Sequence, residues 1–152
     1  MGRWAHGPDS LVVALPDTHP LADARHLSIA QFAEESFVSL PPREEAILPG
    51  RLRRLAHANG FVPEIIQVAP DTQTALAHVS AEVGCHLTLA SVARNATDSP
   101  VVFVPIDETP LDADLSPLDV DLRVAWRRDD NTPALRVVLD EVLRLADDPG
   151  IF

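Results

Sequence analysis

The chain has 152 residues, of which 46% are hydrophobic, and carries a formal net charge of −11 with a pI of about 4.7. This length suits one domain or two small lobes. The negative charge excludes binding of duplex DNA by this chain alone, because such binding needs several neutralised phosphates. The single cysteine, Cys85, excludes an internal disulfide and a zinc site made of cysteines.

The sequence predicts no membrane partner. Its apolar runs are too short to cross a bilayer, and its first residues lack the apolar centre of a signal peptide. We therefore expect a cytoplasmic protein.

The first 35 residues predict one strand and one helix. Residues 1–10 show no periodicity, and we expect a frayed lead-in or an artificial chain boundary there. Residues 11–15 are continuously apolar, which is typical of a strand covered on both faces. Ser28 and Gln31 have the spacing of a capping box, which predicts a helix over residues 29–35.

Residues 37–91 carry the main repeating pattern of strands and helices in the chain. Apolar runs at 37–40, 64–68 and 85–89 alternate with helical patterns that end near Gly60 and Gly84, and Asp71 is a suitable N-cap for the second helix. We expect both glycines to take the left-handed cap position. Strand, helix, strand, helix, strand is a βαβαβ unit, and the crossover rule makes its sheet largely parallel.

The start of the helix before Gly60 has two possible positions. Pro42 could lie in its first turn, or Pro49 could be its first residue, with 41–48 as a loop, and we prefer the second. Its expected buried stripe is Leu48, Leu52, Leu55 and Ala56. The inward positions of the following helix are Ala75, Leu76, Val79 and Val83.

The remainder of the chain predicts a short helical turn at 92–95, a strand at 101–104, an acidic and proline-rich loop at 107–119, and a half-buried strand from 120. Thr132 and Pro133 mark the start of a long last helix. Its apolar stripe is Leu135, Val138, Leu139, Val142 and Leu145. The expected organisation is a lead-in at 1–10, a lobe at 11–106, the loop at 107–119, and a returning strand and helix at 120–152.

Parallel sheets bind ligands beyond the carboxyl ends of their strands. The loops at 40–48, 69–73 and 89–91 should therefore face one crevice. The N-termini of the helices after Leu48 and after Pro70 would point N–H groups into it, which favours a carboxylate or similar anion. Solvation of these groups by water is an equally good interpretation.

Other chemistry has little support. Adjacent strand residues point to opposite faces, so Cys85 and His86 cannot form a dyad, and a packed cysteine is the favoured interpretation. Arg51, Arg53 and Arg54 could bind an acidic partner, although a solvated helix face is more common. Histidines without metal-ligand spacing are His19, His26, His57 and His78. The phosphate-binding and serine-hydrolase motifs are absent from the sequence, and we expect no metal, no cofactor and no catalysis.

An ordered set of segments resembles the effector-binding domain of LysR-type transcriptional regulators. These segments are residues 11–16, His19-Pro20-Leu21-Ala22, residues 27–32, Phe37-Val38, Gly60-Phe61-Val62-Pro63 and residues 79–91. The resemblance implies a fold like that of type 2 periplasmic-binding proteins, with two α/β lobes, a small-molecule effector between them and no catalysis.

The resemblance covers part of the family pattern. In the family, a winged helix-turn-helix, a linker helix and half of one lobe precede the segment that corresponds to Leu11. We therefore expect the second lobe plus the returning elements of an incomplete first lobe, with DNA contacted only through a helix-turn-helix domain that this chain lacks. Where the family usually has glycine, a hydrophobe, glycine and later proline, this sequence has Glu82, Val83, Gly84 and Leu89.

Family effector contacts come from the loop that corresponds to residues 41–48. The resemblance thus places Ala46, Ile47 and Leu48 at the helix end of the site, with Arg43 as the nearby cation. The apolar Ile47 predicts a ligand that is bulky or apolar on this side. Together with the crevice argument, the expected ligand-binding residues are Leu40, Pro41, Pro42, Arg43, Ala46, Ile47, Leu48, Thr72 and Gln73.

The leading hypothesis is an effector-sensing domain that binds a small metabolite. The alternative is a protein interaction or dimerisation module, because the last helix has a wide apolar stripe that needs a partner. In either case we expect a homo-oligomer, formed by swapping or by pairing exposed strand and helix surfaces. A hydrolase that uses Cys85 is a weakly supported third possibility.

Overall fold

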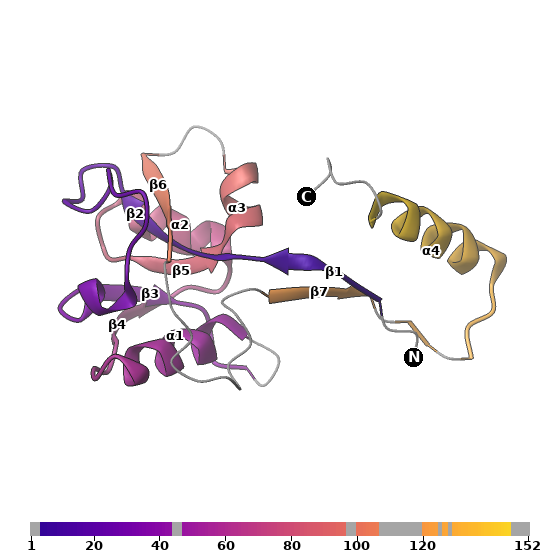
Figure 1. Ribbon diagram of the computed structural model, residues 1–152, viewed down its shortest axis with the longest axis horizontal. Coiled ribbons are helices and arrows are strands. Elements are labelled where there is room, and N and C mark those ends of the chain that lie inside the picture. The colour runs from indigo at the N-terminus through magenta and orange to yellow at the C-terminus, as the bar shows by residue number, and fades with distance from the viewer. Residues whose placement is uncertain are drawn as a thin grey trace. The chain divides into compact units, whose positions relative to one another are not determined.

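The computed structural model describes residues 4–43, 47–96, 100–106, 120–124, 126–127 and 129–146. Its elements are, in order, β1 (Trp4–Asp9), β2 (Leu11–Pro16), η1 (Ile29–Phe32), β3 (Ser36–Ser39), α1 (Ile47–Ala58), β4 (Glu64–Val68), α2 (Thr72–Ser80), β5 (His86–Leu89), α3 (Ala90–Asn95), β6 (Val101–Pro105), β7 (Val120–Val124) and α4 (Pro133–Ala146) (Figure 1). The chain divides into two compact units, residues 10–119 and residues 1–9 with 120–152.

The larger unit contains a mixed and mostly parallel arrangement of strands. β3 pairs with β4 in parallel, and a parallel bridge between Phe37 and Cys85 links β3 to β5. β2 is antiparallel to both of its neighbours, β5 and β6. The strand order is therefore β4-β3-β5-β2-β6, in which only β2 runs against the others. This arrangement confirms the α/β class and the parallel βαβαβ unit.

β2 lies at the centre of the core. All six of its residues are buried: the five of the apolar run at 11–15, as predicted, and Pro16, which the sequence had placed after the strand. α2 packs against β2, β3 and β5, while α1 contacts β5 and η1. The Phe32 and Phe37 rings lie 6.0 Å apart, which joins η1 to β3.

The first short helix differs from its prediction. The capping box is present, because Ser28 Oγ accepts from Ala30 N and Gln31 Oε1 accepts from Ser28 N. The segment is nevertheless a 3₁₀ helix over residues 29–32 rather than a helix to residue 35. Its backbone bonds join residues three apart, from Ala33 N–H to Ala30 O and from Glu35 N–H to Phe32 O, which is the 3₁₀ pattern.

α1 ends as the sequence predicted. Gly60 has φ of 79°, its N–H donates to His57 O, and Phe61 N–H donates to Ala56 O. These two bonds form the Schellman motif, and the buried Pro63 follows it. The helix begins at Ile47 rather than at the expected Pro49, which becomes its third residue. Of the two predicted starts, the one at Pro49 lies nearer to the observed start at Ile47.

α2 ends differently. Asp71 is the N-cap, since its Oδ1 accepts from Thr74 N, but the helix stops at Ser80. The left-handed position is Glu82, with φ of 60°, and the expectation that Gly84 takes it is wrong. Val83 N–H donates to His78 O and Glu82 N–H donates to Val79 O, so this is a second Schellman motif with glutamate at its cap.

The smaller unit contains β1, β7 and α4. β1 and β7 are antiparallel, with an irregularity between His6 and Pro8. The expectation of a frayed lead-in at 1–10 is therefore wrong for residues 4–9, which form a strand that pairs with β7. The predicted loop at 107–119 lies outside the described residues.

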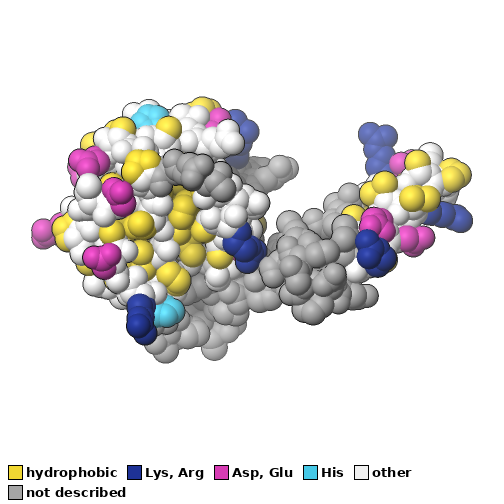
Figure 2. All heavy atoms as spheres, turned by 90° about the horizontal axis from the view of Figure 1, so that it is seen from above, with side chains coloured by type: hydrophobic (Ala, Val, Ile, Leu, Met, Phe, Trp, Pro, Cys, Tyr) yellow, Lys and Arg dark blue, Asp and Glu magenta, His cyan; other side chains and the backbone are white. Residues whose placement is uncertain are grey.

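α4 begins as predicted, with Thr132 Oγ1 accepting from Leu135 N. Its hydrophobic side chains are among those at the surface in Figure 2, and Val137 and Val138 are 68% and 56% exposed. In the part of the chain that the structure describes, no helix is both long enough and apolar enough to cross a membrane.

Candidate functional site

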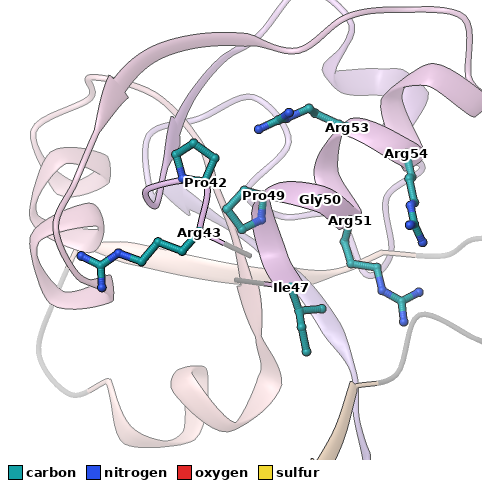
Figure 3. Close-up of a pocket in the computed structure, with 8 residues that line it drawn as sticks. All are labelled: Pro42, Arg43, Ile47, Pro49, Gly50, Arg51, Arg53 and Arg54. Atoms are coloured by element: carbon teal, nitrogen blue, oxygen red, sulfur yellow. The ribbon is translucent and has the colours of Figure 1, made fainter. Parts of the chain in front are cut away.

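A cavity of about 610 Å³ lies at the N-terminal end of α1 (Figure 3). Its lining residues are Pro42, Arg43, Ile47, Pro49, Gly50, Arg51, Arg53 and Arg54. In Figure 3 the Arg43 side chain extends to one side of the cavity, while those of Arg51 and Arg54 extend to the opposite side. The arginines therefore surround the cavity with positive charge without converging on one point.

The first turn of α1 adds to this positive character. The N–H groups in the first turn of a helix have no partner within the helix, and the helix dipole places a partial positive charge there. In α1 these groups belong to Ile47, Leu48 and Gly50, because Pro49 has no N–H. An anion at this end would meet the N–H groups, in a region where the nearby guanidinium groups add positive charge.

A second cavity lies beside the first and is much smaller, at about 10 Å³. Its lining residues are Val38, Ser39, Leu40, Leu48, Pro49, Leu52, His86 and Leu87. Pro49 lines both cavities, so they adjoin at the first turn of α1. The smaller cavity thus lies between the end of β3, the start of α1 and β5.

His86 is the ionisable residue of the smaller cavity. It is 1% exposed, and its Nδ1 donates to Val38 O at 2.9 Å. Its Nε2 is buried and has no hydrogen-bond partner among the described residues. Burial lowers the pKa of this imidazole, although the bond to Val38 opposes that shift. The ring is therefore neutral near pH 7.

Thr88 shows a similar feature two residues further along β5. It is fully buried, and its Oγ1 has no partner among the described residues. Residues two apart on a strand share a face, so His86 and Thr88 place two unpaired polar atoms on one face of β5. Buried polar atoms without partners are uncommon, because each costs about 1–3 kcal/mol.

The structure brings together only some of the residues that the sequence predicted. Pro42, Arg43 and Ile47 line the larger cavity, and Leu40 and Leu48 line the smaller one. Pro41 is half-buried and lines neither cavity. Thr72 and Gln73, at the start of α2, line neither cavity either. Ala46 lies outside the described residues.

The N-terminus of α2 already holds a carboxylate. Asp71 accepts from Thr74 N at 2.7 Å, and that bond lowers the pKa of its carboxyl group. A second anion there would be repelled by the first. The start of α2 therefore does not favour the anion that the sequence suggested.

Sequence reasoning missed several residues of both cavities. It assigned Arg51, Arg53 and Arg54 to the solvated side of α1; Arg53 and Arg54 are exposed and Arg51 is half-buried. It gave His86 no role, because a single histidine inside an apolar strand carries no spacing signal. Only the three-dimensional contact with Val38 and the cavity distinguishes this histidine.

Cys85 belongs to a separate cluster. Ligand atoms of His19, Glu35 and Cys85 all lie within 4.8 Å of one another. His19 Nδ1 accepts from Leu21 N, so its proton is on Nε2, which lies 3.4 Å from Glu35 Oε1. Burial, and secondly the Glu35 charge, raise the pKa of the Cys85 thiol to about 12. A thiol that stays protonated at neutral pH is a poor nucleophile, so the structure does not favour attack by Cys85.

Comparison with known proteins identifies the family. The model of the LysR substrate binding domain matches residues 5–147. The Hca operon transcriptional activator HcaR of Escherichia coli (strain K12) is 30% identical over 128 residues, which are 84% of this chain and 40% of that protein. The chain spans about two fifths of the length of the curated relatives that it matches.

Solved structures share the fold. The effector-binding domain of BenM with its effector benzoate has a TM-score of 0.72 and 19% identity, over 99% of this chain and 65% of that one. The effector-binding domain of QuiR in complex with shikimate has a TM-score of 0.70 and 18% identity, over 95% of this chain and 65% of that one. The resemblance seen in the sequence is confirmed, and the chain belongs to the LysR substrate-binding domain family.

Proposed function

We propose that this chain senses a small carboxylate metabolite for a transcription regulator, and that the carboxylate binds at the N-terminal end of α1. The observation that carries the proposal is the cavity of about 610 Å³ at this helix end, which Arg43, Arg53 and Arg54 help to line. Two effects favour an anion in it, the helix dipole with its N–H groups and the guanidinium charges.

The ligands of the structural neighbours support the carboxylate class. Benzoate and shikimate are both carboxylates, and each is named with an effector-binding domain that shares this fold. The apolar Ile47 and Pro42 on the cavity wall suit the ring or chain that such molecules carry. The proposed role is binding rather than catalysis, and it needs no cofactor.

DNA contact belongs to another part of the regulator in this proposal. The chain has a net charge of −11, so its own surface repels phosphates. We infer that a helix-turn-helix domain on a longer polypeptide supplies DNA binding in the cytoplasm, and that effector binding here changes its action.

Thermal unfolding with a panel of small carboxylates tests the proposal. A binder present at a hundredfold over its dissociation constant should stabilise the chain by about 2.7 kcal/mol. Arg43→Gln should weaken this effect, and the matched change Arg94→Gln on α3, away from the cavity, should not. An uncharged amide analogue that binds as well as its carboxylate would contradict the proposal.

The second candidate function is a homo-oligomeric interaction module. Ile65, Ile66 and Val68 of β4 are 40%, 53% and 49% exposed, and this strand pairs with β3 alone among the described strands. An exposed apolar strand edge and the apolar residues on α4 favour self-association. Light scattering that shows a monomer at about 10–100 μM, the usual working range, would contradict this candidate.

A further inference from the structure

The His86 imidazole presents one unused nitrogen to the protein interior. A carbonyl oxygen can only accept, so the 2.9 Å bond to Val38 O fixes the proton on Nδ1. Nε2 is then the nitrogen without a proton in the neutral ring. It is buried in a side chain that is 1% exposed, and it has no partner among the described residues.

This nitrogen is therefore a hydrogen-bond acceptor. Burial lowers the pKa of His86, so the neutral form prevails near pH 7. A carboxylate oxygen next to Nε2 would bring two lone pairs together. The group that satisfies Nε2 must instead donate, as a hydroxyl group does.

The cavity that His86 lines accepts a group of that size. Its volume of about 10 Å³ is close to the room that one water-sized group needs. Leu40 and Leu48, at the two ends of the 41–47 segment, also line it. Pro49 also lines the larger cavity, where the proposed function places the carboxylate, so both cavities border the same residue.

We infer that His86 Nε2 accepts a hydrogen bond from a hydroxyl group of the effector, so that the site selects hydroxylated carboxylates over their deoxy analogues. This inference rests on the proposed function, because it concerns a second point of contact with the same ligand. It assigns His86 the role of a specificity-determining residue and gives the effector a class, a hydroxy-carboxylate.

Matched ligand pairs test the inference. Calorimetric titrations would compare benzoate with meta- and para-hydroxybenzoate, and cyclohexene carboxylate with shikimate. Wild-type protein should bind at least one hydroxylated member about tenfold more tightly than its deoxy partner, which is the strength of one good hydrogen bond. His86→Phe should lose this preference, so that it binds the hydroxylated and deoxy members of each pair with equal affinity.

The control variant is His57→Phe, which changes an exposed histidine on α1 that lines neither cavity. It should keep the preference for the hydroxylated ligand. A wild-type protein that binds deoxy and hydroxylated ligands equally, with water alone on Nε2, would overturn the inference but leave the proposed function intact. A preference that survives in His86→Phe would also overturn the inference and leave the proposed function intact. Binding of no carboxylate at all would overturn both the inference and the proposed function.

A measurement on the wild-type protein covers the case in which His86→Phe does not fold. The NMR shifts of imidazole nitrogens report which nitrogen carries the proton. The Nε2 resonance of His86 should have the shift of an unprotonated nitrogen, and it should move when a hydroxylated ligand binds. A resonance that moves equally with the deoxy ligand would overturn the inference.

Discussion

Gly84 lies directly against the backbone of Ser36. A Cβ atom on residue 84 would be 2.7 Å from Ser36 O, and the next residue, Cys85, donates its N–H to the same oxygen at 2.8 Å. The glycine is thus needed for the close approach of β5 to β3, which holds the parallel part of the sheet together. A side chain here would separate the two strands that carry His86 and Val38.

We predict that Gly84→Ala destabilises the fold by about 2–3 kcal/mol, because the clashing atoms belong to the backbone and cannot move aside. Urea unfolding measures the effect. The matched control is Gly50→Ala, which meets nothing within 4 Å in α1 and should stabilise by about 0.5–1 kcal/mol. Equal effects of the two changes would contradict the close approach.

Glu82 provides a second prediction. Its φ of 60° is unfavourable for any residue with a Cβ, and its Oε1 accepts from Thr18 Oγ1 at 2.7 Å. Both Glu82→Ala and Glu82→Gly remove that bond, but only glycine also relieves the backbone. The glycine variant should therefore be more stable than the alanine variant by about 1 kcal/mol in thermal unfolding. Identical stabilities would show that the backbone at residue 82 is unstrained.

Thr88 tests the cost of an unpaired hydroxyl group. Because Oγ1 is buried without a partner, Thr88→Val should increase the free energy of unfolding by about 1 kcal/mol. Thr88→Ser keeps the hydroxyl group and loses the methyl group, so it should be destabilising. A valine variant that is instead less stable would show that the hydroxyl group is hydrogen-bonded in the folded protein.

The neutral His86 predicts a pH dependence of stability. Burial holds the pKa of His86 in the folded protein below the ordinary histidine value of 6.5, so the unfolded chain binds more protons when the pH falls below that value. The contribution of this residue is complete above about pH 6.5 and decreases as the pH falls toward the lower folded pKa. Urea unfolding from pH 8 to 5 should show a smaller loss in His86→Phe than in wild type. Parallel pH profiles would contradict the burial of a neutral ring.

Local signals in the sequence were sufficient for most of the larger unit. Gly60 before a Phe-Val-Pro segment, and Asp71 before a helical stripe, specify their helix ends through bonds to nearby residues. Such signals act over a few positions, so the sequence alone contains them. The α/β class and the family also followed from the order of these elements.

Features that depend on distant residues could not be predicted. β1 pairs with β7, more than a hundred residues away, and its Gly7 and Pro8 are poor strand formers. Gly84 leaves room for the backbone of Ser36, and the left-handed position lies at Glu82 instead. The contact with Ser36 is not visible in any local sequence pattern. His86 gained its role through Val38, on a different strand.

β2 has hydrogen-bonded neighbours along both edges, with β5 over residues 11–14 and β6 over residues 12–16. Its amide protons can therefore exchange with deuterium only when the whole unit opens, and those of Val13 and Ala14 should be the last to do so. β4, which is exposed and pairs only with β3 among the described strands, should exchange early. The order of isotope uptake along the chain would follow the strand order of the sheet, from its outer strand to its centre.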